Sequence, residues 1–203
     1  MAEPLNTSEL GSKSYWDAAY RTELSNHATD ASDEGTIWFS DTGAEEKVLS
    51  LLEDLADEGI LHKCPSSDAD ADDGTAVPPP TSGEGTVEFY RWDLLADDPG
   101  NWLGEGFDVV LDKGTFDAIS LAEGTDGQGR RAHEGYRDRV LPLVKKGGFF
   151  VITSCNWTRE EVLQWFGGGE GELRLFREVK YPSFTFGGKK GQSVCTLAFR
   201  RGK

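Results

Sequence analysis

The sequence is poor in the residues that build metal centres and covalent cross-links. Its 203 residues include only three cysteines and three histidines. Cys64, Cys155 and Cys195 are far apart, odd in number and without metal-ligand spacing, and the histidines are just as scattered. These patterns argue against a zinc site and against a Cys-His nucleophile pair, and they favour a reducing compartment. We therefore expect no catalytic metal and a cytoplasmic location.

Long apolar runs and basic charge are also scarce. No apolar run approaches the roughly eighteen residues of a membrane span, and the first ten residues lack the pattern of a secretory signal. Lysine and arginine number 21 against 36 aspartates and glutamates, which gives a net charge of −15. Because phosphate neutralisation needs clustered basic residues, we expect neither a nucleic-acid nor a membrane partner. A basic protein substrate suits this charge better, although solvated acidic segments such as 68–73 explain part of it.

The chain alternates between strand and helix patterns, which is typical of a single α/β domain over residues 1–203. Continuous apolar runs such as 107–111 suit strands that are covered on both faces. Residues 64–86 contain three consecutive prolines and almost no large apolar residue, which predicts a disordered insert or linker. Helices are predicted over 11–24, 43–58 and about 131–145, and a short one after Thr158. Strands are predicted over 87–92, 107–111, 148–154, 173–181 and 193–201. The last two strands should form an antiparallel hairpin.

An acidic residue follows each of the first two predicted strands. Asp93 follows 87–92, and Asp112 follows 107–111 and precedes Lys113 and Gly114. Ligands of open α/β sheets bind outside the carboxyl ends of the strands, so Asp112 is a candidate functional residue. A simple turn in which glycine supplies the bend is the alternative, but packing explains an acid at this position poorly. We therefore favour a functional role for Asp112.

Four stretches of the chain together resemble one known family. They are LGSKSYWDAAY (10–20), GTIWFSD (35–41), DKGTFDAISL (112–121) and PSFTFGGKKGQSV (182–194). The combination is similar to the lysine methyltransferases that act on translation elongation factor 1-alpha, whereas DKGT-x-D alone recurs in several protein methyltransferases. The resemblance implies the Rossmann-like seven-strand methyltransferase fold, S-adenosylmethionine as cofactor and elongation factor 1-alpha as substrate. We expect a monomer.

The resemblance also implies roles at the cofactor. Asp93 would accept a hydrogen bond from the adenine amino group, and the backbone N–H of Leu94 would reach a ring nitrogen. Asp112 and the backbone of Lys113 and Gly114 would line the methyl end. There a carboxylate can orient the incoming amine and help it to lose a proton.

Four aromatic residues are candidates for a wall around the substrate lysine. Phe116, Trp16, Tyr20 and Trp38 carry faces that attract an ammonium group, although core packing explains each of them equally well. Phe116 and Asp112 are the two candidate catalytic residues.

One segment of the family pattern has no counterpart in this chain. In the family, the helix that matches 43–58 is followed by a strand, a glycine-rich turn, a helix and a second strand ending in an acid. Here the chain passes from glycine-containing residues 83–86 directly into 87–92, which correspond to the third strand. The glycine clusters at 83–86, 167–171 and 187–191 lack the strand-turn-helix context of a cofactor loop.

The missing segment predicts a smaller sheet and weak cofactor binding. We expect about five strands, with 87–92 paired beside 107–111 and the terminal hairpin at the far edge.

Two alternatives stay open for function. The chain is either a lysine methyltransferase or an inactive splice form or truncated product that serves at most as a partner-binding module.

Overall fold

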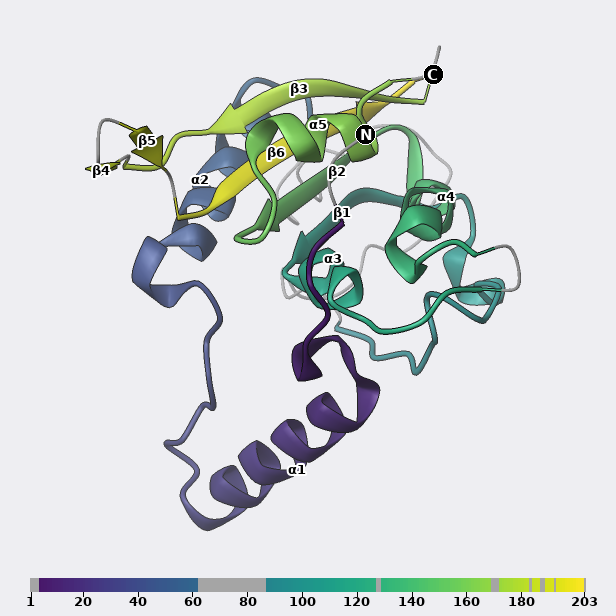
Figure 1. Cartoon of the computed structure of the whole chain (residues 1–203). Coiled ribbons are helices and arrows are strands. Elements are labelled where there is room, and N and C mark those ends of the chain that lie inside the picture. The colour runs from purple at the N-terminus through teal and green to yellow at the C-terminus, as the bar shows by residue number, and fades with distance from the viewer. Residues whose placement is uncertain are drawn as a thin grey trace, which may run out of the picture.

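The centre of the molecule is a four-stranded sheet with the strand order β1-β2-β6-β3 (Figure 1). The structure is a computed structural model that describes residues 4–61, 87–126, 129–168, 172–182, 184–186, 189–191 and 193–202. β2 pairs with β1 in parallel and with β6 antiparallel, and β6 pairs antiparallel with β3. The α/β class and the terminal hairpin are thereby confirmed. The strands are β1 (Phe107–Lys113), β2 (Val144–Ser154), β3 (Leu173–Val179) and β6 (Cys195–Arg201), with a separate hairpin of β4 (Phe184–Phe186) and β5 (Lys189–Gly191).

Two of the helices begin where the sequence predicts. The Ser12 hydroxyl accepts the backbone N–H of Tyr15, and Thr158 forms a capping box with Glu161. Over the described ranges, no helix combines the length and apolarity needed to cross a bilayer. The helices are α1 (Lys13–Thr29), α2 (Ala44–Asp57), α3 (Thr115–Ser120), α4 (Tyr136–Val140) and α5 (Arg159–Phe166).

The middle of β2, residues 149–152, is continuously apolar because helices cover both of its faces. Phe150 and Ile152 belong to the larger core cluster, which also contains Phe166 of α5. Phe149 and Val151 point to the opposite face and pack in a second cluster together with residues of α2. Successive strand residues point to opposite faces, so a continuous apolar run is what a strand between two helical layers requires.

The predicted strand at 87–92 is not formed, which corrects the five-strand expectation for the central sheet. These residues have no regular secondary structure, and the side chain of Phe89 is 93% exposed. Pairing in parallel beside β1 would need a crossover over one face of the sheet, usually through an α-helix. Residues 93–106 contain a turn and the 3-10 helix Asn101–Leu103 but no α-helix, so the connection needed for that pairing does not exist.

The predicted helix over about 131–145 is replaced by three short pieces. A 3-10 turn at Ala132–Gly135 leads into α4, and a second 3-10 turn at Leu141–Leu143 leads into β2. Pro142 lies in the second turn and has no backbone N–H to continue an α-helix. The insert predicted at 64–86 lies outside the described residues.

The N-terminal segment is fixed against α3 by backbone contacts. The Arg131 guanidinium donates hydrogen bonds to the carbonyl oxygens of Leu5, Ser120 and Ala122 at 2.7, 3.0 and 3.2 Å. A Cβ on Gly11 would lie 2.2 Å from the carbonyl carbon of Leu121, so only glycine permits this approach. These contacts determine where α1 leaves the domain.

Truncation of the core should destabilise the fold strongly. Phe166 is fully buried and its ring packs against Phe116, Phe150 and Phe199. We expect Phe166→Ala to lower the free energy of unfolding by about 3–5 kcal/mol, because it removes apolar contacts and leaves a cavity. Urea denaturation measures this loss. The exposed Leu49 serves as the control, since Leu49→Ala should change the stability by no more than about 0.5 kcal/mol.

Candidate functional site

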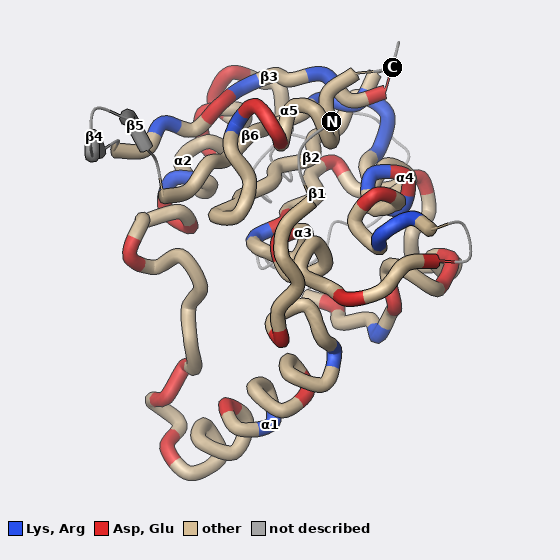
Figure 2. Tube along the Cα trace, in the orientation of Figure 1, with Lys and Arg blue, Asp and Glu red and all other residues tan. Residues whose placement is uncertain are grey.

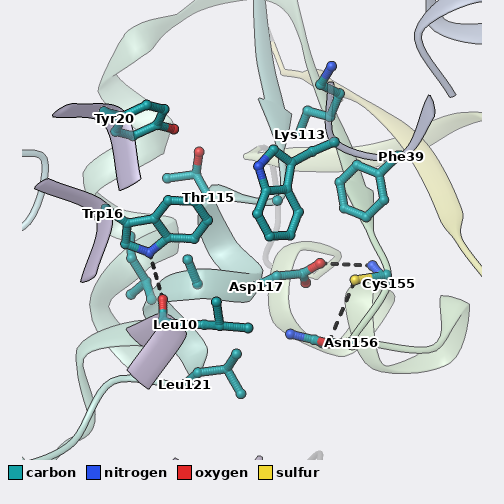
Figure 3. Close-up of a pocket in the computed structure, with 14 residues that line it drawn as sticks. Leu10, Trp16, Tyr20, Phe39, Lys113, Thr115, Asp117, Leu121, Cys155 and Asn156 are labelled. Atoms are coloured by element: carbon teal, nitrogen blue, oxygen red, sulfur yellow. Dashed lines mark hydrogen bonds between the residues drawn. The ribbon is translucent and has the colours of Figure 1, made fainter. Parts of the chain in front are cut away.

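A pocket of about 350 Å³ lies at the carboxyl ends of β1 and β2 (Figure 3). Segments that are distant in the sequence build it: the N-terminal region with α1, the segment before α2, the β1–α3 turn and the end of β2. In parallel strands these ends meet at one edge of the sheet, which is where ligands of α/β proteins bind. The pocket is lined by Leu10, Trp16, Tyr20, Trp38, Phe39, Lys113, Gly114, Thr115, Asp117, Ala118, Ile119, Leu121, Cys155 and Asn156.

Three of the predicted aromatic residues come together in this pocket. The ring centroid of Trp16 lies 5.2 Å from that of Trp38 and 5.9 Å from that of Tyr20. The indole N–H of Trp16 donates to the carbonyl oxygen of Leu10 at 2.7 Å, which fixes the ring. In Figure 3, Trp16 and Tyr20 lie on the side of the pocket opposite Cys155.

The β1–α3 turn fits closely against the segment before α2. Gly114 has φ +84, and a Cβ there would lie 3.2 Å from the Phe39 ring. Phe39 itself has φ 65, a left-handed conformation that costs energy for a residue with a side chain. The Phe39 ring therefore lies directly against the turn, and Gly114 provides both the bend and the space for the ring.

The carboxylate that lines the pocket is Asp117. It is buried, and it accepts hydrogen bonds from the Ser154 hydroxyl and from the backbone N–H of Cys155, the latter at 2.8 Å. Burial raises the pKa of Asp117, while these hydrogen bonds act in the opposite direction. No role was predicted for Asp117 from the sequence. The available signal was its place as the last residue of DKGTFD, five positions after Asp112.

Asp112 lies behind the pocket and does not line it. Its side chain is 4% exposed and accepts hydrogen bonds from the backbone N–H groups of Thr115 (2.9 Å) and Phe116 (3.2 Å) and from the Tyr136 hydroxyl (2.7 Å). Burial raises the pKa of Asp112 to about 6, although all three hydrogen bonds favour the charged form. Asp112 thus fixes the start of α3 and acts on the pocket through the residues that follow it.

The structure does not bring the other predicted site residues into the pocket as one group. Phe116 is 1% exposed and belongs to the core, with its ring centroid 5.0 Å from that of Phe166. The exposed Asp93 accepts the backbone N–H groups of residues 95 and 96, and Leu94 packs at the margin of the core. Lys113 lines the pocket and forms an ion pair with a glutamate of α2 at 3.2 Å.

The chain is similar to curated protein-lysine methyltransferases over nearly its full length, although no family model matches it. Protein-lysine N-methyltransferase EFM4 of Saccharomyces cerevisiae is 32% identical over 224 residues, which cover 96% of each chain. EEF1A lysine methyltransferase 2 of Danio rerio is 33% identical over 226 residues, covering 98% of this chain and 91% of its own. The human protein of the same name is 32% identical over 226 residues, covering 96% and 87%.

This chain belongs to the EEF1A lysine methyltransferase family. The membership agrees with the strand order of the sheet, which ends in an antiparallel pair as the family resemblance implies. Both alignments quoted for EEF1A lysine methyltransferase 2 extend over more positions than the 203 residues of this chain. These relatives therefore have residues that face gaps in this member of the family.

Asp112 should make the stability of the chain depend on pH. Its folded-state pKa of about 6 lies above the ordinary value of 3.8, so between these values the folded chain binds more protons than the unfolded chain. Its carboxyl group therefore favours folding most below about pH 4, and this contribution is lost as the pH rises through about 6. We expect Asp112→Asn to become more stable relative to the parent chain by up to about 3 kcal/mol between pH 4 and pH 7.

Urea denaturation of both proteins across this range measures the difference. Comparison with the Asn variant isolates Asp112 from Asp117, whose pKa is shifted in the same direction. Parallel stability profiles of the two proteins would contradict the assignment.

Proposed function

We propose that this chain is an S-adenosylmethionine-dependent N-methyltransferase and that its pocket receives a lysine side chain of elongation factor 1-alpha. The observation that carries the proposal is the combination of an aromatic wall and a buried carboxylate, Asp117, in one pocket. Trp16, Tyr20 and Trp38 form this wall. A lysine presents an apolar stem and a terminal amine, which match these two surfaces. The names of the relatives state lysine methylation and, for the vertebrate proteins, EEF1A.

The chemistry requires a neutral amine that is held in one orientation. The cofactor, when bound, supplies the methyl group in an in-line displacement, and a lysine with an ordinary pKa of about 10.4 must first lose a proton. The faces of Trp16, Trp38 and Tyr20 attract the ammonium form and shield it from water. Asp117 can accept a hydrogen bond from the ammonium group, which loses one proton to solvent water, and the carboxylate then orients the lone pair of the neutral amine. Asp112 acts as a positioning residue because it fixes the turn that carries Asp117.

The described residues fit the acceptor lysine better than they fit the whole cofactor. β1, Gly114 and α3 form a strand-turn-helix connection, but the first N–H groups of α3 already donate to Asp112. The amides of Thr115 and Phe116 are therefore already used within the domain and are not available for the carboxylate of the methionine moiety. Asp93 and Leu94 remain the candidates for the adenine, on the family resemblance alone.

A specific observation also favours the second candidate, a non-catalytic product that retains the partner-binding surface. In the described part of the chain, β1 pairs on one edge only, and Leu111 on it is 56% exposed. The family pattern has its central strand at this edge, together with the cofactor loop. Alignments longer than the chain agree with the absence of such a segment.

Affinity for S-adenosylmethionine distinguishes a chain with a complete cofactor site from one that lacks the glycine-rich segment. A hydrogen bond to a charged group contributes about 1.5–3 kcal/mol, and the missing segment would supply at least two such contacts. We expect a dissociation constant of roughly 0.1 mM or weaker, because losing about 3–6 kcal/mol weakens a micromolar site at least a hundredfold. Calorimetric titration of the 203-residue chain tests this, and micromolar binding would show that the chain has a complete cofactor site.

Methyl transfer tests the proposed function directly. With elongation factor 1-alpha and several millimolar S-adenosylmethionine, we expect methyl-lysine on the substrate by mass spectrometry. Asp117→Asn should lower the rate at saturating substrate about 100-fold, because it removes the negative charge beside the amine and leaves only a neutral amide oxygen as acceptor. Asp108→Asn, at an exposed position of β1, is the matched control and should keep the parental rate.

A negative result in this experiment decides between the two candidate functions and tests the role of Asp117. If the parent chain binds elongation factor 1-alpha and transfers no methyl group at any cofactor concentration, the non-catalytic alternative holds. Equal rates for Asp117→Asn and the parent chain would remove Asp117 from the reaction.

A further inference from the structure

Helix α1 carries an apolar stripe that the described part of the domain leaves uncovered. None of its 17 residues is buried, and Figure 1 shows the helix projecting away from the sheet. Trp16, Tyr20 and Leu24 are spaced by four residues and therefore lie on one face of the helix. Leu24 at the outer end is 72% exposed. An apolar face that is not used in the core is available to a partner.

The segment that returns from α1 extends the same surface. Ile37 and Trp38 are both exposed, and the Trp38 ring contacts that of Trp16 at 5.2 Å between centroids. The segment is held to the helix because the Glu23 carboxylate accepts the backbone N–H of Thr36 at 3.1 Å. We define the α1 stripe as Trp16, Tyr20, Leu24, Ile37 and Trp38.

The α1 stripe is continuous with the pocket. Trp16, Tyr20 and Trp38 line the pocket, whereas Leu24 and Ile37 are outside its lining. From residue 16 to residue 24 the helix rises about 12 Å, a length that about four residues of an extended peptide would cover. A peptide on the stripe would therefore lead directly to the aromatic wall and Asp117.

Acidic side chains surround the stripe, so the complementary partner is basic. Figure 2 shows acidic positions on α1 and along the segment that follows it. Arg21 is one of few basic residues there, and a chain with a net charge of −15 attracts positive partners over a distance. The acidic residues are Asp17, Glu23, Asp30, Asp33, Glu34 and Asp41.

We infer that the α1 stripe docks the segment of elongation factor 1-alpha that flanks the acceptor lysine, and that this segment combines apolar with basic residues. The inference rests on the proposed function and adds to it the surface that selects the substrate. Free lysine fits the pocket alone, whereas a lysine within the right segment also contacts Leu24 and Ile37. These two residues therefore determine specificity and take no part in the methyl transfer.

The test is a binding measurement with purified elongation factor 1-alpha and the full 203-residue chain, by biolayer interferometry. The double variant Leu24→Ala/Ile37→Ala removes exposed apolar groups without touching the pocket lining, and circular dichroism verifies that it folds. We expect about tenfold weaker binding, the effect of losing two partly buried anchors at an interface. The control Leu49→Ala removes another exposed leucine, from α2, and should bind within about twofold of the parent chain.

Several outcomes separate this inference from the proposed function. Unchanged binding by the double variant, or no binding by the parent chain, overturns the docking surface. A dimer of the parent chain in light scattering that the double variant lacks, together with unchanged binding of the factor, also overturns it. Stripe-dependent binding without methyl transfer supports the docking surface and rejects the catalytic proposal. Methyl transfer together with binding that the double variant does not weaken rejects the docking surface and leaves the catalytic proposal in place.

Discussion

The pocket depends on one buried carboxylate, that of Asp112. It joins three elements, because it belongs to β1, accepts the first amides of α3 and accepts the hydroxyl of Tyr136 at the start of α4. A buried charge is costly in an apolar core, and these donors offset part of that cost. The turn that Asp112 holds seats Gly114 against Phe39 and directs Asp117 to the end of β2. The positions of Gly114 and Asp117 in the pocket thus depend on hydrogen bonds to a carboxylate buried in the domain.

The buried core and the proposed recognition surface lie in different parts of the chain. The sheet and α2–α5 contain the buried clusters, whereas α1 buries no residue and contributes only to the pocket and its surroundings. Arg131 connects the two parts through backbone carbonyl groups on both sides. Because these contacts use backbone oxygens, substitutions on the outer face of α1 can change recognition with little effect on the core.

Sequence patterns predicted the elements whose signals are local. The apolar run in β1, the caps at Ser12 and Thr158 and the terminal hairpin all depend on neighbouring residues, and the structure has them. The segment 87–92 has a strand composition, but a strand also needs a partner and a connection of suitable length. Pro142 ended a helix whose apolar periodicity continued past it.

The candidate site was predicted only in part, because local sequence patterns do not determine the contacts between distant elements. The spacing in DKGTFD places Asp112 and Asp117 near one turn, but the direction of each carboxylate depends on the φ of Gly114 and on the donors of neighbouring elements. Composition also cannot separate Phe116, which is in the core, from Trp16, which is in the pocket. Both residue types pack well in either environment.

The outer edge of β1, with which no strand in the described residues pairs, has a consequence for handling the protein in solution. An edge with unpaired backbone groups can add a strand from another molecule, which is the first step of edge-to-edge aggregation. Phe107 and Leu111 are exposed on this strand, and Asp108 and Lys113 are the charges on it that oppose such addition. Both charges form ion pairs, with Lys145 and Glu45. Association at this edge is therefore opposed by two charged side chains on one seven-residue strand, in addition to the net charge of −15 of the whole chain.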